Sequence, residues 1–204
     1  MQIQEYSNCQ LPTHRGTFDV RVFRNDQDES ESLAISMGED FSEEEAVFVR
    51  IHSECFTGEV LGSLKCDCQQ QLDLALQRIG ETKRGIVVYL RQEGRGIGLG
   101  NKIRAYAEQA KGANTVEANH ILGFPADLRD FSLAALILRE FGVHRINLNT
   151  NNPRKVDSMK RYGLEVNEVV PSLTPPNEFN EAYLATKAEE LGHLNLKNRF
   201  QNVP

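Results

Sequence analysis

Three cysteines in one short stretch are the residues of this sequence best suited to bind a metal. Cys55, Cys66 and Cys68 lie within HSECFTGEVLGSLKCDCQQQL. Residues two apart cannot share a helix face, so Cys66 and Cys68 can chelate one ion only from a turn or an extended segment. Three thiolates suit Zn²⁺ and leave a fourth position for water, as in catalytic zinc sites. The alternative is that they are small buried hydrophobic residues, and spacing alone does not decide between the two.

A three-thiolate centre would need cations or bases nearby. Three thiolates on one divalent ion leave a net negative charge, which weakens the ability of the metal to acidify water. From Lys83 to Arg104 the chain has six basic residues and one acidic residue, whereas Asp26 to Glu45 has nine acidic residues and no Lys or Arg. A basic segment in a chain of net charge −6 favours a small anionic ligand over a nucleic acid. A solvated helix face is the plain alternative.

A glycine-rich segment lies inside this basic region. Residues 91–100 read RQEGRGIGLG, after an apolar run and before a helical pattern. Glycines let the backbone approach phosphate, and a helix N-terminus attracts anions. The segment matches neither a Walker A loop nor a regular G-x-G-x-x-G, so an ordinary glycine-rich turn remains an alternative.

Two further loops carry polar side chains before helices. Asp127 and Arg129, in GFPADLRDF, would point to the same side of an extended segment. The alternative for them is a surface ion pair worth about 0–1 kcal/mol. Residues 150–155, TNNPRK, offer hydroxyl, amide and cationic groups, and helix capping by Asn152 would be compatible with a binding role.

Alternating strands and helices must position these loops. The β-branched, aromatic and apolar runs predict strands at Phe18–Phe23, Ser32–Met37, Ala46–Ile51, Gly85–Leu90, Arg145–Thr150 and Val166–Val170. Helical periodicity and caps predict helices after Cys68, from Asn101 to Gly112, from Asp130 to Gly142, from Asn152 to Gly163, and over Asn180–Leu194. We expect an α/β fold, a mixed sheet flanked by helices in a single domain over 1–204, with function at the carboxyl ends of strands.

Length and composition exclude several classes of protein. The 204 residues, 40% hydrophobic and 25% charged, are typical of one globular domain. We find no apolar run long enough to cross a bilayer and no signal-peptide pattern, so we expect a cytoplasmic protein. In that reducing compartment the four cysteines favour thiols or metal ligands over disulfides, and we interpret Cys9 as structural.

Taken together, these segments resemble GTP cyclohydrolase II across nearly the whole chain, least over the first 40 residues. The motifs that carry the resemblance are RIHSEC, GSLKCDC, RQEGRGIGL, NKIRAYA, TVEAN, LGFPADLRDF, TNNPRK and YLATKAEELGHL. Each is loose alone, but eight in order are specific. Departures are QQQ after Cys68 and glycine at position 100, where relatives often have leucine.

The resemblance implies a role for each matching residue. It assigns zinc, one ion per subunit, to Cys55, Cys66 and Cys68. It assigns GTP contacts to Arg50, Ile51, His52, Ser53, Glu54, Gln71, Glu93, Gly94, Arg95, Thr115, Thr150 and Lys155. Asp127 matches the proton acceptor and Arg129 the proposed nucleophile. Tyr106 matches a tyrosine that is altered in relatives that stop after ring opening, so its presence favours the full reaction.

The implied reaction is hydrolysis of GTP to 2,5-diamino-6-ribosylamino-4(3H)-pyrimidinone 5′-phosphate, formate and pyrophosphate, the first step of riboflavin biosynthesis. The resemblance also implies Mg²⁺ with the triphosphate and a homodimer. Two rivals remain open: a variant cyclohydrolase that feeds another pathway, and a zinc-stabilised nucleotide-binding protein without catalysis. The first would give a different product, and the second would bind GTP without releasing pyrophosphate.

Overall fold

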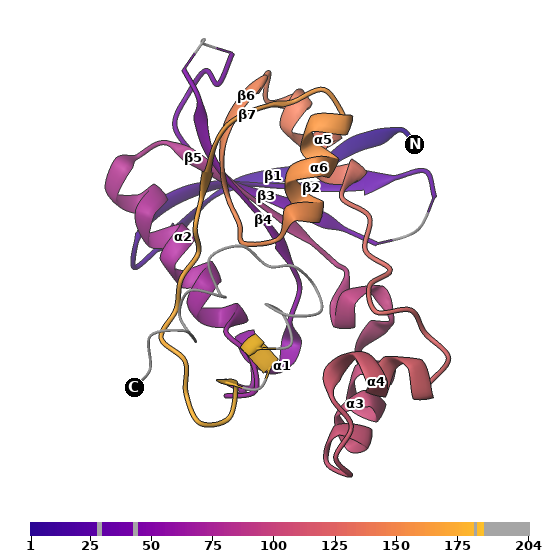
Figure 1. Cartoon of the computed structure of the whole chain (residues 1–204). Coiled ribbons are helices and arrows are strands. Elements are labelled where there is room, and N and C mark those ends of the chain that lie inside the picture. Colours follow the sequence, from indigo (N-terminus) through magenta and orange to yellow (C-terminus); the bar gives the residue numbers. More distant parts are fainter. Residues whose placement is uncertain (28–29, 43–44, 182, 186–204) are drawn as a thin grey trace. The chain divides into compact units, whose positions relative to one another are not determined.

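A seven-stranded mixed sheet forms the centre of the fold. The computed structural model describes residues 1–27, 30–42, 45–181 and 183–185 (Figure 1). Its strands are β1 (Ile3–Thr13), β2 (Gly16–Asn25), β3 (Ser32–Met37), β4 (Val47–Ser53), β5 (Gly85–Leu90), β6 (Arg145–Asn149) and β7 (Glu165–Val170), in the spatial order β1-β2-β3-β5-β4-β6-β7. The β1-β2-β3-β5 part is antiparallel and β4-β6-β7 is parallel, so the prediction of a mixed α/β sheet is confirmed.

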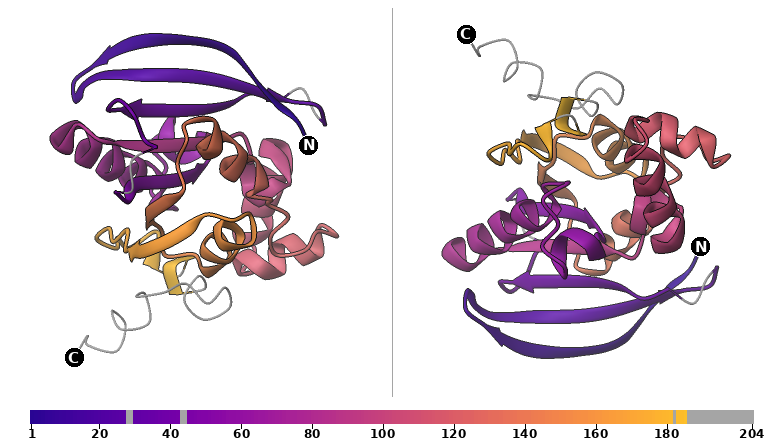
Figure 2. Two further views of the ribbon diagram at one scale, coloured as in Figure 1. Left: turned by 90° about the horizontal axis from the view of Figure 1, so that it is seen from above. Right: turned by 90° about the horizontal axis from the view of Figure 1, so that it is seen from below.

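The first strand was not predicted from the sequence. All residues of β1 after Ile3 are exposed, so the strand lacks the alternation of buried and exposed positions that would reveal it. Its backbone pairs with β2 from Ile3–Asn25 to Thr13–Gly16. Both views of Figure 2 show these long strands side by side. Backbone pairing with a neighbour, rather than burial, therefore defines β1.

Helices cover both faces of the sheet. Alternate residues of β5 belong to different clusters: Ile86 and Val88 pack with α5 (Ser132–Glu140) and α6 (Pro153–Arg161), whereas Val87 packs with α2 (Cys68–Thr82). Figure 1 shows α2 apart from the neighbouring α5 and α6. The apolar run GIVVYL is buried on both faces for this reason.

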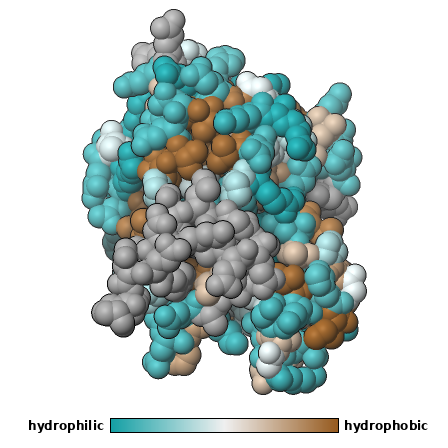
Figure 3. Space-filling model, viewed as in Figure 1, coloured by the Kyte–Doolittle hydropathy of each residue, from teal (hydrophilic) through white to brown (hydrophobic). Residues whose placement is uncertain are grey.

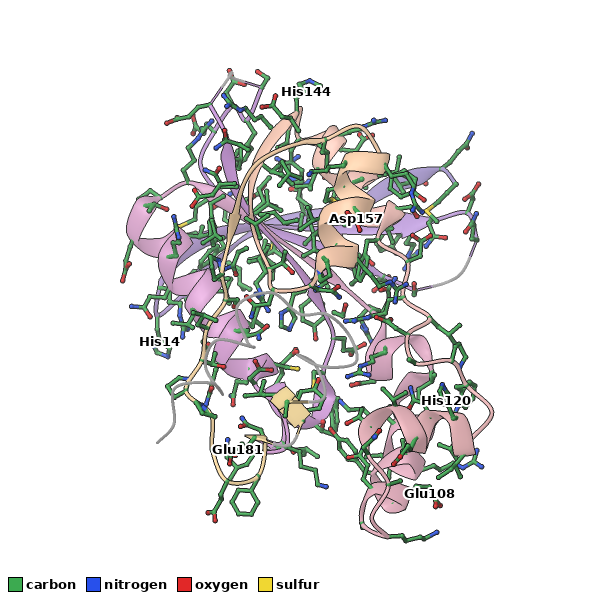
Figure 4. The ribbon with its side chains drawn as sticks, in the orientation of Figure 1. His14, Glu108, His120, His144, Asp157 and Glu181 are labelled. Carbon is green, nitrogen blue, oxygen red and sulfur yellow. The ribbon has the colours of Figure 1, made fainter. Side chains whose placement is uncertain are left out.

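Helix α6 begins where the sequence predicts. Asn152 is its N-cap and accepts a hydrogen bond from the Arg154 backbone N–H, and Pro153 occupies the first helical position. Val156 and Met159 face the core, whereas Asp157, labelled on α6 in Figure 4, is exposed. Cap and periodicity agree, so both ends of α6 follow from local sequence.

The described chain has four further helical elements. These are α1 (Phe56–Glu59), the 3₁₀ helix η1 (Glu93–Gly96), α3 (Gly98–Gln109) and α4 (Thr115–Ile121). The prediction that Asn101 caps α3 is wrong: the helix begins at Gly98, and the Asn101 amide donates to the Ile97 carbonyl within the first turn. Helix α4, which was not predicted, begins with a capping box formed by Asn114 and Glu117.

The chain divides into two compact units. Unit 1 comprises residues 1–52, 72–91 and 130–172, and unit 2 comprises residues 53–71, 92–129 and 173–204. The expectation of a single domain over 1–204 stays a prediction. The helix predicted over Asn180–Leu194 falls largely outside the described residues.

None of the described helices combines the length and apolar character of a transmembrane span. Figure 3 shows hydrophilic residues over most of the visible surface, interrupted by apolar areas. Such a mixture is normal for the surface of a globular protein.

Candidate active site

Three thiols converge in unit 2. Cys55 precedes α1 as its N-cap residue, Cys66 lies in the turn before α2, and Cys68 is the first residue of α2. Their sulfur atoms all lie within 4.8 Å of one another, and the Cys55 and Cys66 sulfurs are 3.6 Å apart. Across the described parts of the chain, this is the one group of three or more Cys, His, Asp or Glu ligand atoms that comes together in this way. The three cysteines therefore form a possible metal site.

A glycine makes room for these sulfurs. A Cβ on Gly58, in α1, would lie 2.9 Å from the Cys66 sulfur and 3.2 Å from the Cys55 sulfur. Both separations are shorter than a normal van der Waals contact. The close approach of the thiols thus requires the missing side chain at position 58.

The thiols share negative charge unequally. Hydrogen bonds from Cys66 and Cys68 lower the pKa of Cys55 well below its usual range, and the neighbouring Lys102 ammonium acts in the same direction. The same bonds, together with burial, raise the pKa of Cys66 and Cys68. Without a metal, the cluster therefore holds its negative charge mainly on Cys55.

Lys102 and Glu93 lie beside the thiols as a buried ion pair. The Lys102 ammonium donates to the Glu93 Oε1 at 2.7 Å and to the Cys55 sulfur at 3.1 Å. The two side chains are only 11% and 8% exposed. Burial lowers the pKa of Lys102, but Glu93 and the Cys55 charge more than offset burial, so the pKa is raised. Lys102 is therefore a fixed cation.

Tyr106 stands one turn further along α3. Burial raises the pKa of its hydroxyl to about 12, although a hydrogen bond with Thr57 and the Lys102 charge act against the increase. The ammonium of Lys65 lies 5.2 Å and that of Lys102 5.7 Å from the centre of its ring. At neutral pH Tyr106 is a neutral hydrogen-bond donor or acceptor.

Asp127 and Arg129 form a bidentate pair. The Arg129 Nε donates to the Asp127 Oδ1 at 2.9 Å and the second guanidinium nitrogen donates to Oδ2 at 2.8 Å. Their side chains are 7% and 13% exposed, so this is not an ordinary surface ion pair. The guanidinium also donates to the Ser53 hydroxyl at 3.4 Å. Burial opposes the charge on Arg129, but Asp127 outweighs burial and raises the pKa of the guanidinium.

The glycine-rich segment holds Arg95 in an unusual conformation. Gly94 and Arg95 have φ of 62° and 61°, in the left-handed region that few side chains adopt. Among the described residues, no group accepts a hydrogen bond from the buried Nη2 of Arg95. The guanidinium lies 5.8 Å from the centre of the Tyr183 ring. A strained loop that carries a partly buried arginine with an unused donor is suited to an anion.

A second polar group lies in unit 1, at the ends of β4 and β6. The Arg50 side chain donates to the His52 Nδ1 at 3.1 Å and to the side-chain oxygens of Asn149 and Ser172 at 2.9 and 3.1 Å. Lys155, on α6, donates from its ammonium to the Ile51 carbonyl at 2.7 Å. These residues lie at the carboxyl ends of parallel strands, where the sequence predicts function.

Four further residues of the predicted site have the following local contacts or positions. Thr150 accepts a hydrogen bond from the Asn152 backbone N–H, and the Gln71 amide donates to Asp67. Thr115 is the first residue of α4, and Glu54 follows β4. For Thr115 and Glu54 a direct place in the site remains a prediction.

Two residues that lie near the thiols and cations of unit 2, Lys102 and Tyr183, were not singled out from the sequence. Lys102 occurs in NKIRAYA, and its i, i+4 spacing to Tyr106 could have indicated a shared helix face. Tyr183 is the first residue of the motif YLATKAEELGHL, but its contact with Arg95 is not visible from the sequence, because the two residues are distant in the chain. Among the described residues no histidine belongs to the cluster: His14, His120 and His144 are exposed, and Figure 4 places His120 on α4.

Comparison with known proteins agrees with these features. The profile of the family described as GTP cyclohydrolase II matches residues 4–171. A protein of Shewanella amazonensis named GTP cyclohydrolase-2 is 51% identical over 201 residues, which are 98% of either chain. Its namesake in Shewanella oneidensis is 51% identical over 200 residues, again 98% of either chain.

A longer relative has the same similarity over part of its length. The riboflavin biosynthesis protein RibBA of Synechocystis is 52% identical over 198 residues, and the chain spans 35% of its length. A solved two-domain 3,4-dihydroxy-2-butanone 4-phosphate synthase of A. baumannii aligns with a TM-score of 0.46 and 18% identity, over 84% of this chain and 40% of that one. At that level the structural likeness supports no inference about function.

Proposed function

Because the chain belongs to the GTP cyclohydrolase II family, we propose that it hydrolyses GTP to 2,5-diamino-6-ribosylamino-4(3H)-pyrimidinone 5′-phosphate, formate and pyrophosphate, the first step of riboflavin biosynthesis. The observation that carries the proposal is that unit 2 holds both a three-thiol cluster and a buried Asp127–Arg129 pair. Ring opening and phosphate cleavage are different reactions, and this unit offers a polar group suited to each.

The three cysteines fit Zn²⁺ as a donor set, with one ion per subunit. A structural zinc site needs four protein ligands, and the converging Cys, His, Asp and Glu groups of the described residues number three. This donor set leaves a coordination position open. When bound there, Zn²⁺ supplies Lewis-acid activation of water for hydrolysis at the guanine ring.

Tyr106 serves the guanine end of the reaction in this proposal. Its pKa of about 12 keeps the hydroxyl protonated at neutral pH, so it can donate a hydrogen bond or a proton to a departing group. Thr57 holds the hydroxyl by a hydrogen bond. Tyr106 is thus suited to the hydration that follows ring opening and releases formate.

Asp127 and Arg129 serve the phosphate end. An arginine nucleophile must lose a proton, and the raised pKa of Arg129 makes a nearby base necessary. Asp127 is that base, with its oxygens 2.8 and 2.9 Å from two guanidinium nitrogens. A protonated Arg129 would instead clamp the phosphate and offset charge as pyrophosphate leaves. The two roles differ in whether lysine can replace Arg129.

Each unit, taken by itself, offers groups suited to bind phosphate. Arg50 and Lys155, with Thr150, provide charge and hydroxyl donors in unit 1, and Arg95 provides a guanidinium in unit 2. We propose that Mg²⁺ accompanies the triphosphate, as is usual for nucleotides. We further propose that the protein is cytoplasmic and forms a homodimer. Light scattering of the purified protein tests the oligomeric state directly.

One incubation tests the proposed reaction. The zinc-loaded protein is incubated with GTP and Mg²⁺, and formate, pyrophosphate and product mass are measured. We expect equal amounts of formate and pyrophosphate. Cys66→Ser should lose zinc and formate release, because a neutral hydroxyl replaces a required thiolate. Cys9→Ser is the matched control, because Cys9 is exposed on β1 and should leave both unchanged.

The same measurement separates the rival functions. A product that retains the formyl carbon would identify a variant cyclohydrolase. GTP binding without formate or pyrophosphate release would identify a non-catalytic nucleotide-binding protein. Stoichiometric zinc and full activity in Cys66→Ser would contradict the three-cysteine assignment.

A further inference from the structure

Lys102 is a buried cation with an anion on either side. Its ammonium lies 3.1 Å from the Cys55 sulfur and 2.7 Å from the Glu93 Oε1. The three groups come from different segments: Cys55 precedes α1, Glu93 is in η1 and Lys102 is in α3. A lysine is rarely buried unless it is paired, so this position requires both partners.

Glu93 is itself anchored to the segment that carries Cys55. Its Oε2 accepts from the Phe56 backbone N–H at 2.6 Å, and its Oε1 accepts from the Gly94 N–H at 2.8 Å. Both carboxylate oxygens therefore have donors from the protein. The carboxylate ties η1 to the start of α1 and holds the lysine against the sulfur, so the N–H···S contact is a built feature of the site.

The hydrogen bond from Lys102 to the Cys55 sulfur affects how strongly the sulfur donates to a bound metal. Three thiolates on one divalent ion carry a net charge of −1, and strong donation from sulfur weakens the metal as a Lewis acid. A hydrogen bond to a thiolate withdraws electron density from the sulfur, and such outer partners tune the metal. Lys102 makes this contact directly, at 3.1 Å from the Cys55 sulfur, whereas Arg129 acts on Cys68 through its charge.

We propose that Lys102 tunes the three-cysteine metal centre through its hydrogen bond to the Cys55 sulfur, with Glu93 as its anchor. The inference rests on the proposed metal site and adds a residue to it. Lys102 acts through Cys55, so it is a positioning and charge-balancing residue. Its loss should weaken the electrophilic character of the metal while leaving GTP binding by the other cations largely intact.

The test uses Co²⁺ in place of Zn²⁺, because thiolate-to-Co²⁺ charge-transfer absorption reports the donor strength of sulfur. In Lys102→Met the lost hydrogen bond raises the energy of the sulfur electrons, so the near-ultraviolet band should move to longer wavelength. Lys102→Arg, which keeps a cation and N–H donors, should restore most of the wild-type position. With zinc, Lys102→Met should lower kcat about tenfold or more, the range of lost outer-shell partners, with a small change in KM.

Lys111→Met is the matched control. Lys111 follows α3 in the same unit and pairs with Glu108, but its side chain is 70% exposed. The substitution removes the same charge without touching sulfur, so neither the band nor kcat should change. A similar shift in this variant would mean that net charge, rather than the hydrogen bond, moves the band.

The outcomes separate the proposed metal site from the proposed role of Lys102. If the wild-type protein takes up no Co²⁺ with thiolate bands, the proposed metal site fails. If it does, and Lys102→Met has the same band and kcat as the wild type, the role of Lys102 is refuted. Circular dichroism checks folding, and Lys102→Gln, which keeps a polar side chain without the charge, carries the same test if Lys102→Met does not fold.

Discussion

Gly58→Ala should weaken zinc binding without destabilising the metal-free protein. The new Cβ would lie 2.9 Å from the Cys66 sulfur and 3.2 Å from the Cys55 sulfur. Optimal non-bonded contacts are about 3.5–4.0 Å, so the Cys66 sulfur would have to move by about 0.6 Å. Metal–ligand distances tolerate only about 0.2 Å. The substitution therefore displaces a ligand by more than a metal site accepts.

The effect on the metal-free fold should have the opposite sign. Gly58 lies in α1 without a positive φ, so alanine suits its backbone and could add up to about 1 kcal/mol of stability. Without a metal, the Cys66 side chain is free to rotate away from the Cβ. We expect the free energy of unfolding of the metal-free protein to be unchanged or slightly increased, and zinc affinity to fall at least about tenfold, which is about 1.4 kcal/mol.

Competition with a chromophoric chelator measures the zinc affinity, and thermal unfolding after chelation measures stability. Gly100→Ala is the matched control: it lies in α3, also without a positive φ, and a Cβ there meets nothing within 4 Å. It should leave zinc affinity unchanged. Wild-type zinc affinity in Gly58→Ala would refute the argument that Gly58 makes room for the sulfurs.

Three further substitutions test other parts of the site. Arg129→Lys should abolish pyrophosphate release with zinc still bound if Arg129 is the nucleophile, whereas a substantial remaining rate would identify a phosphate clamp held by Asp127. Tyr106→Phe should keep the fold but lose the hydrogen bond to Thr57, so mass spectrometry should detect a formylated intermediate. An unchanged yield of formate would show that Tyr106 is only a packing residue. Asn114→Ala removes the acceptor of two backbone N–H groups at the start of α4, and should lower the free energy of unfolding, measured with denaturant, by about 1 kcal/mol. An unchanged free energy of unfolding would contradict the capping role.

Several elements could be predicted because their signals are local. The strands Ser32–Met37 and Gly85–Leu90 match the structure at both ends, and the cap Asn152 with Pro153 marks the start of α6. Each depends on a run of apolar residues or on side chains that bond to the adjacent backbone. The three cysteines could also be recognised from the sequence as candidate ligands, because their spacing requires a turn before α2.

Other features are not visible in the propensities of single segments. Strand β1 is exposed along nearly its whole length and exists by pairing with β2, and α3 starts three residues before the predicted cap Asn101 because the glycine-rich segment leads directly into the helix. Local propensity does not contain either fact.

The sequence by itself determined the family, the α/β class and the set of thiols, because residue types and their order carry that information. Tertiary structure alone decided which charges the thiols meet. Lys102 is 47 residues from Cys55, and the bond between them exists only because α3 and the start of α1 are joined through Glu93. In the sequence Lys102 is one of several basic residues in a polar segment, whereas in the folded chain its ammonium lies against the Cys55 sulfur and the Glu93 carboxylate.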